Sequence, residues 1–203
     1  MSPDLLFSAG ALVFGYVLGS LSAAIITCKL MGLPDPRTTG SNNPGTTNVL
    51  RSGGKKAAAI TLLGDLLKGV IAVIVVGFVD GNPTAMALAG FGAFLGHLYP
   101  VFFRFQGGKG VATALGALLA LSWISGLLAI ATWLAMSLCF RISSLAALTT
   151  FALAPLYLWM RGVDVFTIGV FVLVAMLLAW RHRNNIKNLM AGTEPKIGEK
   201  KKT

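Results

Sequence analysis

The sequence predicts an all-α membrane protein that crosses the bilayer several times. Of the 203 residues, 55% are hydrophobic and only 12% are charged, whereas a soluble domain carries about 25% charged residues. The apolar residues form long runs, and one bilayer span needs about 20 of them. We therefore expect residues 1–203 to form a single integral-membrane domain, with residues 192–203 as a mobile basic tail.

The first apolar run covers residues 5–28. It is too long for the apolar core of a secretory signal, and Asp4 stands where such a signal carries basic residues. We interpret it as a first span that stays in the protein. The runs at 57–79 and 84–103 each have the length of one span.

The run at 111–139 is too long for one span. Its 29 residues would form a helix of about 43 Å, which would have to tilt beyond the usual range to fit a hydrocarbon core of about 30 Å. Ser122, Ser125 and Gly126 offer a place to break it, so two short helices are expected here. The last runs are 142–160 and 163–180.

The basic residues fix the orientation, because Lys and Arg collect in cytoplasmic loops. With seven crossings and the N-terminus outside, every Lys and Arg except Arg161 and Lys68 lies inside. The sequence thus predicts seven transmembrane helices and a cytoplasmic C-terminus. The same bias accounts for the net charge of +10 without a nucleic-acid partner.

Two glycine pairs indicate close packing of helices. Gly15 and Gly19 lie in the first run, and Gly92 and Gly96 lie in the run at 84–103. Small residues four positions apart let two helix backbones approach each other. We expect close helix contacts at both pairs.

The first of three polar cytoplasmic segments reads GSNNPGTTNVLR, from Gly40 to Arg51. Its Ser, Asn and Thr side chains are hydrogen-bond donors, and an arginine binds phosphate through a bidentate fork. We expect Asn43, Thr46 and Asn48 to bind substrate. The alternative is a solvated connector.

The second segment, QGGKGVAT, covers residues 106–113 and leads into a helix. Glycines before a helix N-terminus expose backbone N–H groups, and the helix dipole favours an anion there. Lys109 adds a full positive charge. The pattern is not a nucleotide P-loop, because Phe103 and Gly110 stand where that motif needs Gly and Ser or Thr. The alternative is a tight interfacial turn.

The third segment, HRNNIKNLMAGTEPK, follows the last span at 182–196. If the helix continues past the membrane, His182 and Asn185 share one face. Basic residues next to a membrane commonly only contact lipid headgroups, which is the alternative for Arg181, Arg183 and Lys187.

Ionisable residues also occur within the runs. Asp65 and Lys68 are three residues apart on one helical face, where they can pair. A structural pair is the favoured interpretation, with Lys68 also adding positive potential toward a substrate phosphate. His97 is interpreted as a hydrogen-bonded packing residue.

Together the three segments resemble the signature segments of the bacterial membrane acyl-phosphate:glycerol-3-phosphate acyltransferase family. GYVLGSLSAA (15–24) and GHLYPVFFRF (96–105) extend the resemblance over nearly the whole chain. It implies transfer of a fatty acyl group from acyl phosphate to the 1-hydroxyl of glycerol-3-phosphate, giving lysophosphatidic acid and inorganic phosphate. This is the first acylation of phospholipid biosynthesis, at the cytoplasmic face of the bacterial inner membrane, with neither cofactor nor metal.

The resemblance also assigns site residues. It implies catalytic roles for Ser41, Arg51, His182 and Asn185. It implies a glycerol-3-phosphate loop of Gly107, Gly108, Lys109 and Gly110, and a position important for integrity at Glu194. Asn42 departs from the family pattern, which has glycine there, and Asn is well tolerated if the position needs a positive φ.

The chemistry of an acyl phosphate agrees with this site. Its phosphate leaves readily, so the enzyme mainly positions the hydroxyl and neutralises charge. We expect Ser41 to act as a hydrogen-bonding group, and either His182 or the departing phosphate to accept the hydroxyl proton. Membrane lipid and the soluble enzyme that makes acyl phosphate are further expected partners.

Two other classes of protein are alternatives. A small transporter of phosphorylated metabolites or lipids usually has internal repeats and a site at the midplane of the membrane, whereas these polar segments lie at one face. A scaffold for enzymes of lipid synthesis is the third class.

Overall fold

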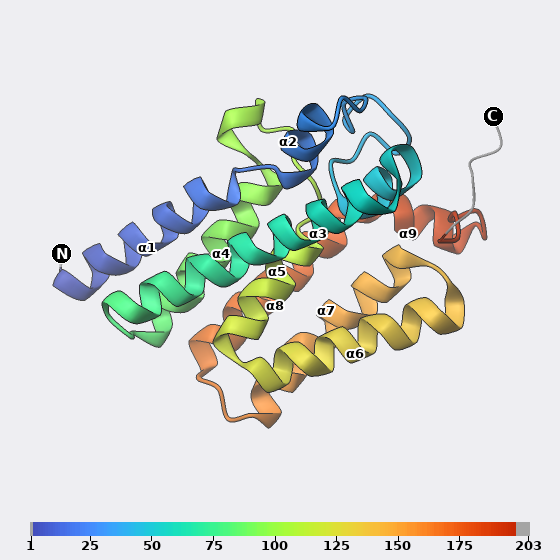
Figure 1. Ribbon diagram of the computed structural model, residues 1–203. Coiled ribbons are helices and arrows are strands. Elements are labelled where there is room, and N and C mark those ends of the chain that lie inside the picture. Colours follow the sequence, from blue (N-terminus) through green and yellow to red (C-terminus); the bar gives the residue numbers. More distant parts are fainter. Residues whose placement is uncertain (1, 198–203) are drawn as a thin grey trace.

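The structure is a computed structural model that describes residues 2–197, and all regular secondary structure in that part is helical. The elements are α1 (Pro3–Gly19), α2 (Ala23–Leu30), α3 (Thr46–Val79), α4 (Pro83–Leu98), the short 3₁₀ helix η1 (Val101–Phe103), α5 (Val111–Leu121), α6 (Trp123–Phe140), α7 (Ser143–Met160), α8 (Val165–Arg181) and α9 (Arg183–Met190). They form an elongated bundle (Figure 1). The expected all-α fold is confirmed.

Several of these helices are long and apolar enough to cross a membrane. Within residues 2–197 five such segments occur: Pro3–Leu30, Thr46–Val79, Pro83–Phe103, Trp123–Phe140 and Ser143–Met160. A sixth arises if α8 and α9, bent by 63°, count as one. The apolar α5 has only 11 residues.

The expected break in the run at 111–139 lies at Ser122, whose extended backbone (φ −152°, ψ 93°) separates α5 from α6. The run at 5–28, predicted as one span, is also divided, into α1 and α2. Ser20 donates its hydroxyl to Tyr16 O at 2.8 Å, and Ser22 caps α2 by accepting from Ile25 N. Serine hydroxyls that bond to nearby backbone groups favour helix ends.

The contact between α1 and α4 is made backbone to backbone, as the two glycine pairs predicted. A Cβ added at Gly15 would lie 2.0 Å from Ala89 O, and one at Gly96 would lie 2.2 Å from Tyr16 O. Any side chain at these positions would push the two helices apart. The two ribbons run side by side in Figure 1.

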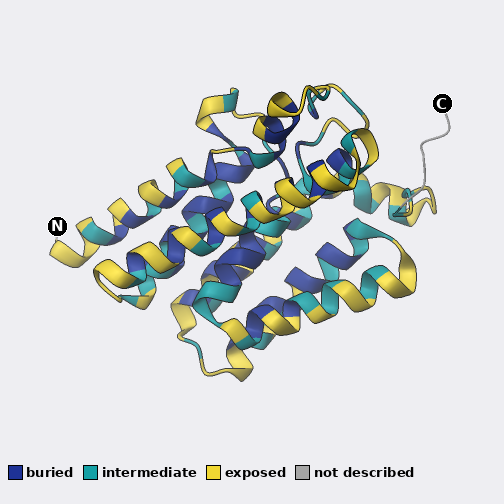
Figure 2. Ribbon diagram, viewed as in Figure 1, coloured by how far each residue is buried: buried dark blue, intermediate teal, exposed yellow. Residues whose placement is uncertain are grey.

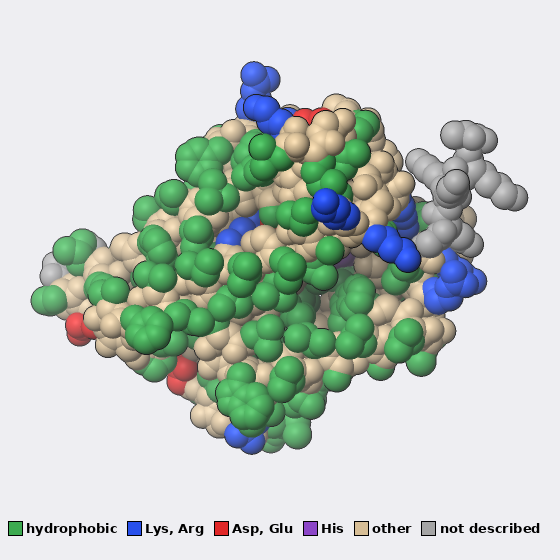
Figure 3. Space-filling view, in the orientation of Figure 1, with side chains coloured by type: hydrophobic (Ala, Val, Ile, Leu, Met, Phe, Trp, Pro, Cys, Tyr) green, Lys and Arg blue, Asp and Glu red, His purple; other side chains and the backbone are tan. Residues whose placement is uncertain are grey.

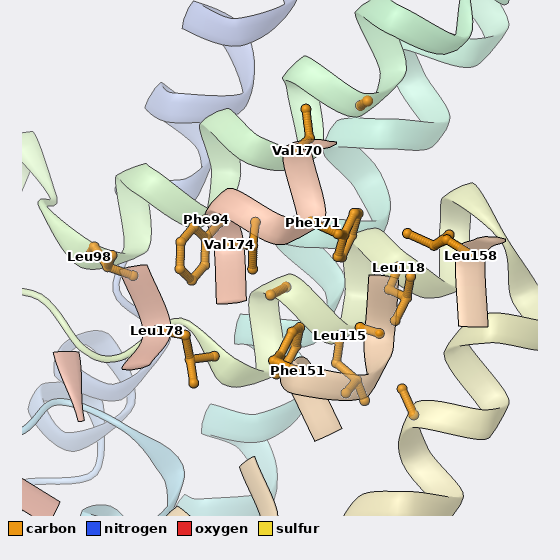
Figure 4. Close-up of a cluster of buried hydrophobic side chains, with 14 residues drawn as sticks. Phe94, Leu98, Leu115, Leu118, Phe151, Leu158, Val170, Phe171, Val174 and Leu178 are labelled. Carbon is orange, nitrogen blue, oxygen red and sulfur yellow. The ribbon is translucent and has the colours of Figure 1, made fainter. Parts of the chain in front are cut away.

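The main hydrophobic core lies where α4, α5, α7 and α8 meet. Phe94, Leu118, Phe151 and Leu178 are almost fully buried there (Figure 4). The outward faces of the helices are exposed although they are apolar, as at Phe78 and Leu138 (Figure 2). This pattern fits a protein whose surroundings are lipid.

Two interruptions shape the end of the bundle that carries α2 and α9. Gly54, with φ 81°, breaks the helical geometry inside α3. His182 follows α8 at the bend into α9, so the last helix does not continue straight. Most of the Lys and Arg side chains visible in Figure 3 gather at this end.

Candidate active site

The three polar segments meet at the end of the bundle that carries α2 and α9. Thr47 Oγ1 and Ser143 Oγ share a hydrogen bond of 3.2 Å, which joins the start of α3 to the start of α7. The ammonium of Lys109 donates to Asn185 Oδ1, which joins the second segment to the third. Residues far apart in the sequence therefore form one site.

Asn48 organises the first segment. Its buried side chain donates to Pro36 O at 2.8 Å and to Thr39 O at 3.0 Å, and its Oδ1 accepts from Ser41 N at 3.0 Å. Gly40 has φ 59°, and a Cβ there would lie 2.3 Å from Asn48 Oδ1. The amide of Asn48 thus fixes the backbone that carries Ser41.

Three of the predicted donors of the first segment have no partner among the described residues. The side chains of Ser41, Asn43 and Thr46 form no hydrogen bond with another residue in the range 2–197, and Ser41 is exposed. Asn42 adopts φ 55°, the left-handed conformation that Asn tolerates better than most residues. The replacement of the usual glycine is therefore accommodated.

Arg51 is an exposed cation beside these donors. It lies one helical turn after Thr47 on α3, and it forms no ion pair within the described chain. Its charge nevertheless acts on Lys109, whose pKa it lowers. The guanidinium is available to an anion from outside the protein.

The glycines of the second segment let its backbone pack against α4 and the first segment. Gly108 N donates to His97 O at 3.1 Å. A Cβ on Gly108 would lie 2.2 Å from His97 Nε2 and 2.9 Å from Pro44 O. Gly110, with φ 82°, is the N-cap of α5 and provides no side chain to cap it. The first N–H groups of α5 are therefore open to an anion.

Lys109 belongs to a chain of hydrogen bonds that ends on α7. Asn185 Nδ2 donates to Glu194 Oε1 at 2.5 Å, and Ser144 Oγ donates to the same oxygen at 2.7 Å. Burial lowers the pKa of Lys109 to about 8, and Arg181 and Arg51 act in the same direction, whereas Glu194 opposes them. Ser144 has no signal in the sequence, because only the folded chain brings it next to Glu194.

His182 is buried, and one of its ring nitrogens faces a backbone carbonyl of α8. Its Nδ1 lies 2.8 Å from Leu178 O. A carbonyl oxygen only accepts, so Nδ1 carries the proton and Nε2 of the neutral ring keeps a free lone pair. Burial, followed by the charge of Lys109, lowers the pKa of His182 to about 4. The ring is neutral at pH 7.

Arg181 is a second functional residue that the sequence pattern does not reveal, because in the sequence it is only a basic residue next to the membrane. Its Nη2 donates to Gly107 O at 2.8 Å and to Gly108 O at 2.9 Å, and its Nε donates to Gly108 O at 3.2 Å. The guanidinium also lies 5.6 Å from the centre of the Tyr99 ring. Nothing local in the sequence signals these long-range contacts.

Comparison with known proteins identifies the family of the chain. Residues 9–192 match the family model described as glycerol-3-phosphate acyltransferase. The chain belongs to this acyltransferase family. It is 54% identical over 195 residues to the glycerol-3-phosphate acyltransferase of Thioalkalivibrio sulfidiphilus, covering 96% of both chains. It is 50% identical over 188 residues to that of Methylococcus capsulatus, covering 93% of this chain and 95% of the relative.

Solved structures agree. The chain is similar to the glycerol 3-phosphate form of PlsY, an integral membrane glycerol 3-phosphate acyltransferase, with a TM-score of 0.89 and 38% identity over 94% of this chain and 96% of that one. The lysophosphatidic acid form gives a TM-score of 0.86 at 37% identity, over 94% and 95% of the two chains. The protein is thus a membrane-embedded acyltransferase.

Lys68 occupies a different place in this acyltransferase from the other predicted site residues. Its ammonium lies 2.9 Å from Asp65 Oδ1 and donates to Leu21 O at 3.0 Å. His97 Nδ1 lies 3.4 Å from the same oxygen of Asp65 and 3.3 Å from Thr113 Oγ1. The predicted pairing of Asp65 with Lys68 is confirmed, and the pair forms a buried cluster with His97 beneath the second segment.

A polar cavity of about 430 Å³ opens between the first and second segments of the acyltransferase. Its lining residues are Arg37, Asn42, Pro44, Phe105, Gln106, Gly107 and Arg181. The guanidinium of Arg37 pairs with Asp35 at 2.6 Å.

The start of the expected C-terminal tail is attached to the protein. Ile197 N donates to Arg141 O at 2.6 Å, and Glu194 accepts the bonds described above. Residues 198–203 of that tail lie outside the described residues.

Proposed function

We propose that the protein transfers a fatty acyl group from acyl phosphate to the 1-hydroxyl of glycerol-3-phosphate. The products are lysophosphatidic acid and inorganic phosphate, as in the first acylation of phospholipid biosynthesis. The observation that carries the proposal is the meeting of Arg51, Lys109 and the neutral His182 at one end of the bundle. Two phosphates of roughly −1.5 to −2 each require such cations. Solved structures of relatives in a glycerol 3-phosphate form and a lysophosphatidic acid form support the proposed substrate and product.

The residues divide into phosphate holders and positioning groups. Lys109, with Gly107, Gly108 and Gly110, holds the phosphate of glycerol-3-phosphate at the start of α5. Arg51 holds the phosphate of the acyl donor, because its fork has no partner within residues 2–197. Asn185 orients Lys109, as their hydrogen bond supports.

The first segment supplies neutral donors. Ser41, Asn43 and Thr46 hydrogen-bond the substrates, because no other residue of the described part of the chain bonds to their side chains. Asn48 acts indirectly, because its amide bonds hold the backbone of Ser41. Lys68 contributes its positive potential from below the site and not a direct contact.

The reaction itself needs one new bond and one proton acceptor. The hydroxyl oxygen of glycerol-3-phosphate attacks the carbonyl carbon of the acyl phosphate, and the bond from that carbon to the phosphate oxygen breaks. The hydroxyl proton passes to His182 Nε2 or to the departing phosphate. The free lone pair of Nε2 supports the first route.

We propose seven crossings, made by α1 and α3 to α8, with the N-terminus outside and the site facing the cytoplasm of the bacterial inner membrane. The gathering of Lys and Arg at the site end supports this orientation (Figure 3). The short α5 crosses only part of the bilayer, about 16 Å by its length, and is shielded by close contact with α3, where a Cβ on Gly116 would lie 2.1 Å from Leu66 O. Membrane lipid and the soluble enzyme that makes acyl phosphate are proposed partners.

The test uses pure protein in detergent with acyl phosphate and glycerol-3-phosphate. We expect inorganic phosphate and 1-acyl-glycerol-3-phosphate in equal amounts, with no effect of a chelator. A folded protein that gives no product, or that gives it only with added metal or nucleotide, refutes the proposal.

Two controls accompany this assay. The Ser41→Ala, Arg51→Ala double variant should reach the membrane and yet release no phosphate above background. Detergent abolishes the two compartments that a transporter needs, so a transporter would leave both compounds unchanged.

A further inference from the structure

The backbone of the second segment is held from two sides. The peptide group between Gly107 and Gly108 uses both of its polar atoms, since its C=O accepts from Arg181 Nη2 at 2.8 Å and its N–H donates to His97 O at 3.1 Å. The next peptide group, between Gly108 and Lys109, has its C=O held by Nε and Nη2 of Arg181. Arg181 therefore fixes the orientation of two successive peptide planes.

The second of these peptide planes has a free donor. In a trans peptide the N–H points opposite to the C=O, so the N–H of Lys109 points away from the guanidinium that holds Gly108 O. No residue between 2 and 197 accepts a hydrogen bond from this N–H. It lies next to the open N–H groups at the start of α5.

We infer that Arg181 is a positioning residue that orients the loop 107–109 so that the backbone N–H of Lys109 binds the phosphate of glycerol-3-phosphate. The inference rests on the proposed function and adds to it a backbone ligand and the residue that aims this ligand. The phosphate then receives the main-chain N–H and the ammonium of the same lysine.

The chemistry of the guanidinium explains why an arginine stands here. Its Nε and Nη2 form a fixed fork that reaches two adjacent carbonyls at once, whereas a lysine ammonium is a single point on a flexible stem. These carbonyl oxygens carry negative partial charge near a site for an anion. Their engagement by a cation lowers that repulsion. The ring of Tyr99 beneath the guanidinium keeps it in place.

The test compares Arg181→Gln and Arg181→Lys with a matched control, Arg183→Gln. Arg183 is exposed two residues further on, and its guanidinium lies 4.9 Å from the centre of the Trp180 ring. Arg181→Gln should raise the KM for glycerol-3-phosphate about tenfold or more, as expected for lost hydrogen bonds from a charged group. Arg181→Lys should give an intermediate value. The KM for acyl phosphate, and both constants of Arg183→Gln, should stay within about twofold of wild type.

A second measurement detects the loop without any substrate. Hydrogen–deuterium exchange of the peptide that contains residues 106–110 should be faster in Arg181→Gln than in wild type and Arg183→Gln, because the N–H of Gly108 loses its fixed plane. A raised KM with unchanged exchange would make Arg181 a direct phosphate ligand and overturn the inference.

Two other outcomes also overturn it. One is an unchanged KM for glycerol-3-phosphate. The other is a general defect, in which both KM values rise equally while kcat and the folded yield fall. If wild-type protein transfers nothing from acyl phosphate, the proposed function fails. The exchange data still report on Arg181 in that case.

Discussion

The ammonium of Lys109 donates a hydrogen bond to Oδ1 of Asn185, although 76 residues separate them in the sequence. The Nδ2 of the same amide donates to Glu194, which also accepts a hydrogen bond from Ser144. A carboxylate is thus tied to the cation through a neutral amide and not by a direct ion pair. Lys109 keeps its charge available for a substrate phosphate.

Lys109 should produce the alkaline limb of the pH profile. Its pKa of about 8 means that the ammonium loses its charge as the pH rises through that value, so kcat/KM for glycerol-3-phosphate should fall above about pH 8. In Lys109→Arg this limb should move above about pH 10, because a guanidinium stays protonated. Lys55→Arg, at an exposed lysine, is the control. A limb that stays at pH 8 in Lys109→Arg would assign it to another group.

His182 should produce an acid limb well below the ordinary histidine range. Its pKa of about 4 predicts that kcat/KM stays level from pH 7 down to about pH 5 and falls below that, as Nε2 takes a proton. His182→Asn should remove the limb if His182 is the base. If the limb persists at the same pH with a lower rate, the departing phosphate accepts the proton.

Arg51→Ala should remove a charge-assisted contact to phosphate, worth about 1.5 to 3 kcal/mol, and so lower kcat/KM about 10- to 150-fold. Arg51→Lys should recover only part of this loss, because it lacks the fork. Phosphate release at equal membrane levels measures both. Lys55→Ala, at an exposed cation of the same helix, should behave like wild type; Arg51→Ala with the same kinetics as this control would remove Arg51 from the site.

Gly15→Ala should destabilise the contact between α1 and α4. The new Cβ would lie 2.0 Å from Ala89 O, whereas Gly10, on the same helix, has no neighbour within 4 Å of its added Cβ. Overpacking of this kind costs about 1 to 3 kcal/mol. Thermal unfolding in detergent should therefore show a Tm lowered by several degrees for Gly15→Ala and no loss for Gly10→Ala. Equal Tm values would show that the helices separate without cost.

The orientation can be tested by labelling single cysteines in a variant that lacks Cys28 and Cys139. In intact cells an impermeant thiol reagent should not reach cysteines at positions 55, 104 or 141 and should label those at 80 or 161. Labelling at 104 or 141 from outside would refute the seven-span arrangement.

The sequence was sufficient for the long helices and for the break at Ser122, because length and apolar runs decide both. It also predicted which segments are polar, but not how they join. Arg181 and Ser144 act through contacts to Gly108 and Glu194, which lie at least 50 residues away. No local pattern encodes such pairs. The division of α1 from α2 depends on serine hydroxyls inside an apolar run, whose effect is set by the surrounding structure.

The pairing of Asp65 with Lys68 has a consequence for biogenesis. Both charges belong to one helix and lie one turn apart, 2.9 Å between Nζ and Oδ1, so α3 carries its own counter-charge when it leaves the translocon. Insertion of a helix with a lone Asp or Lys costs about 2.5 to 3.5 kcal/mol, so such a helix would need a partner helix to supply the counter-charge. In glycosylation-based insertion assays of isolated α3, Asp65→Asn should therefore insert less efficiently than wild type, even though it removes a charge. The enzyme's third helix can thus settle in the membrane before the chain that completes its site has been synthesised.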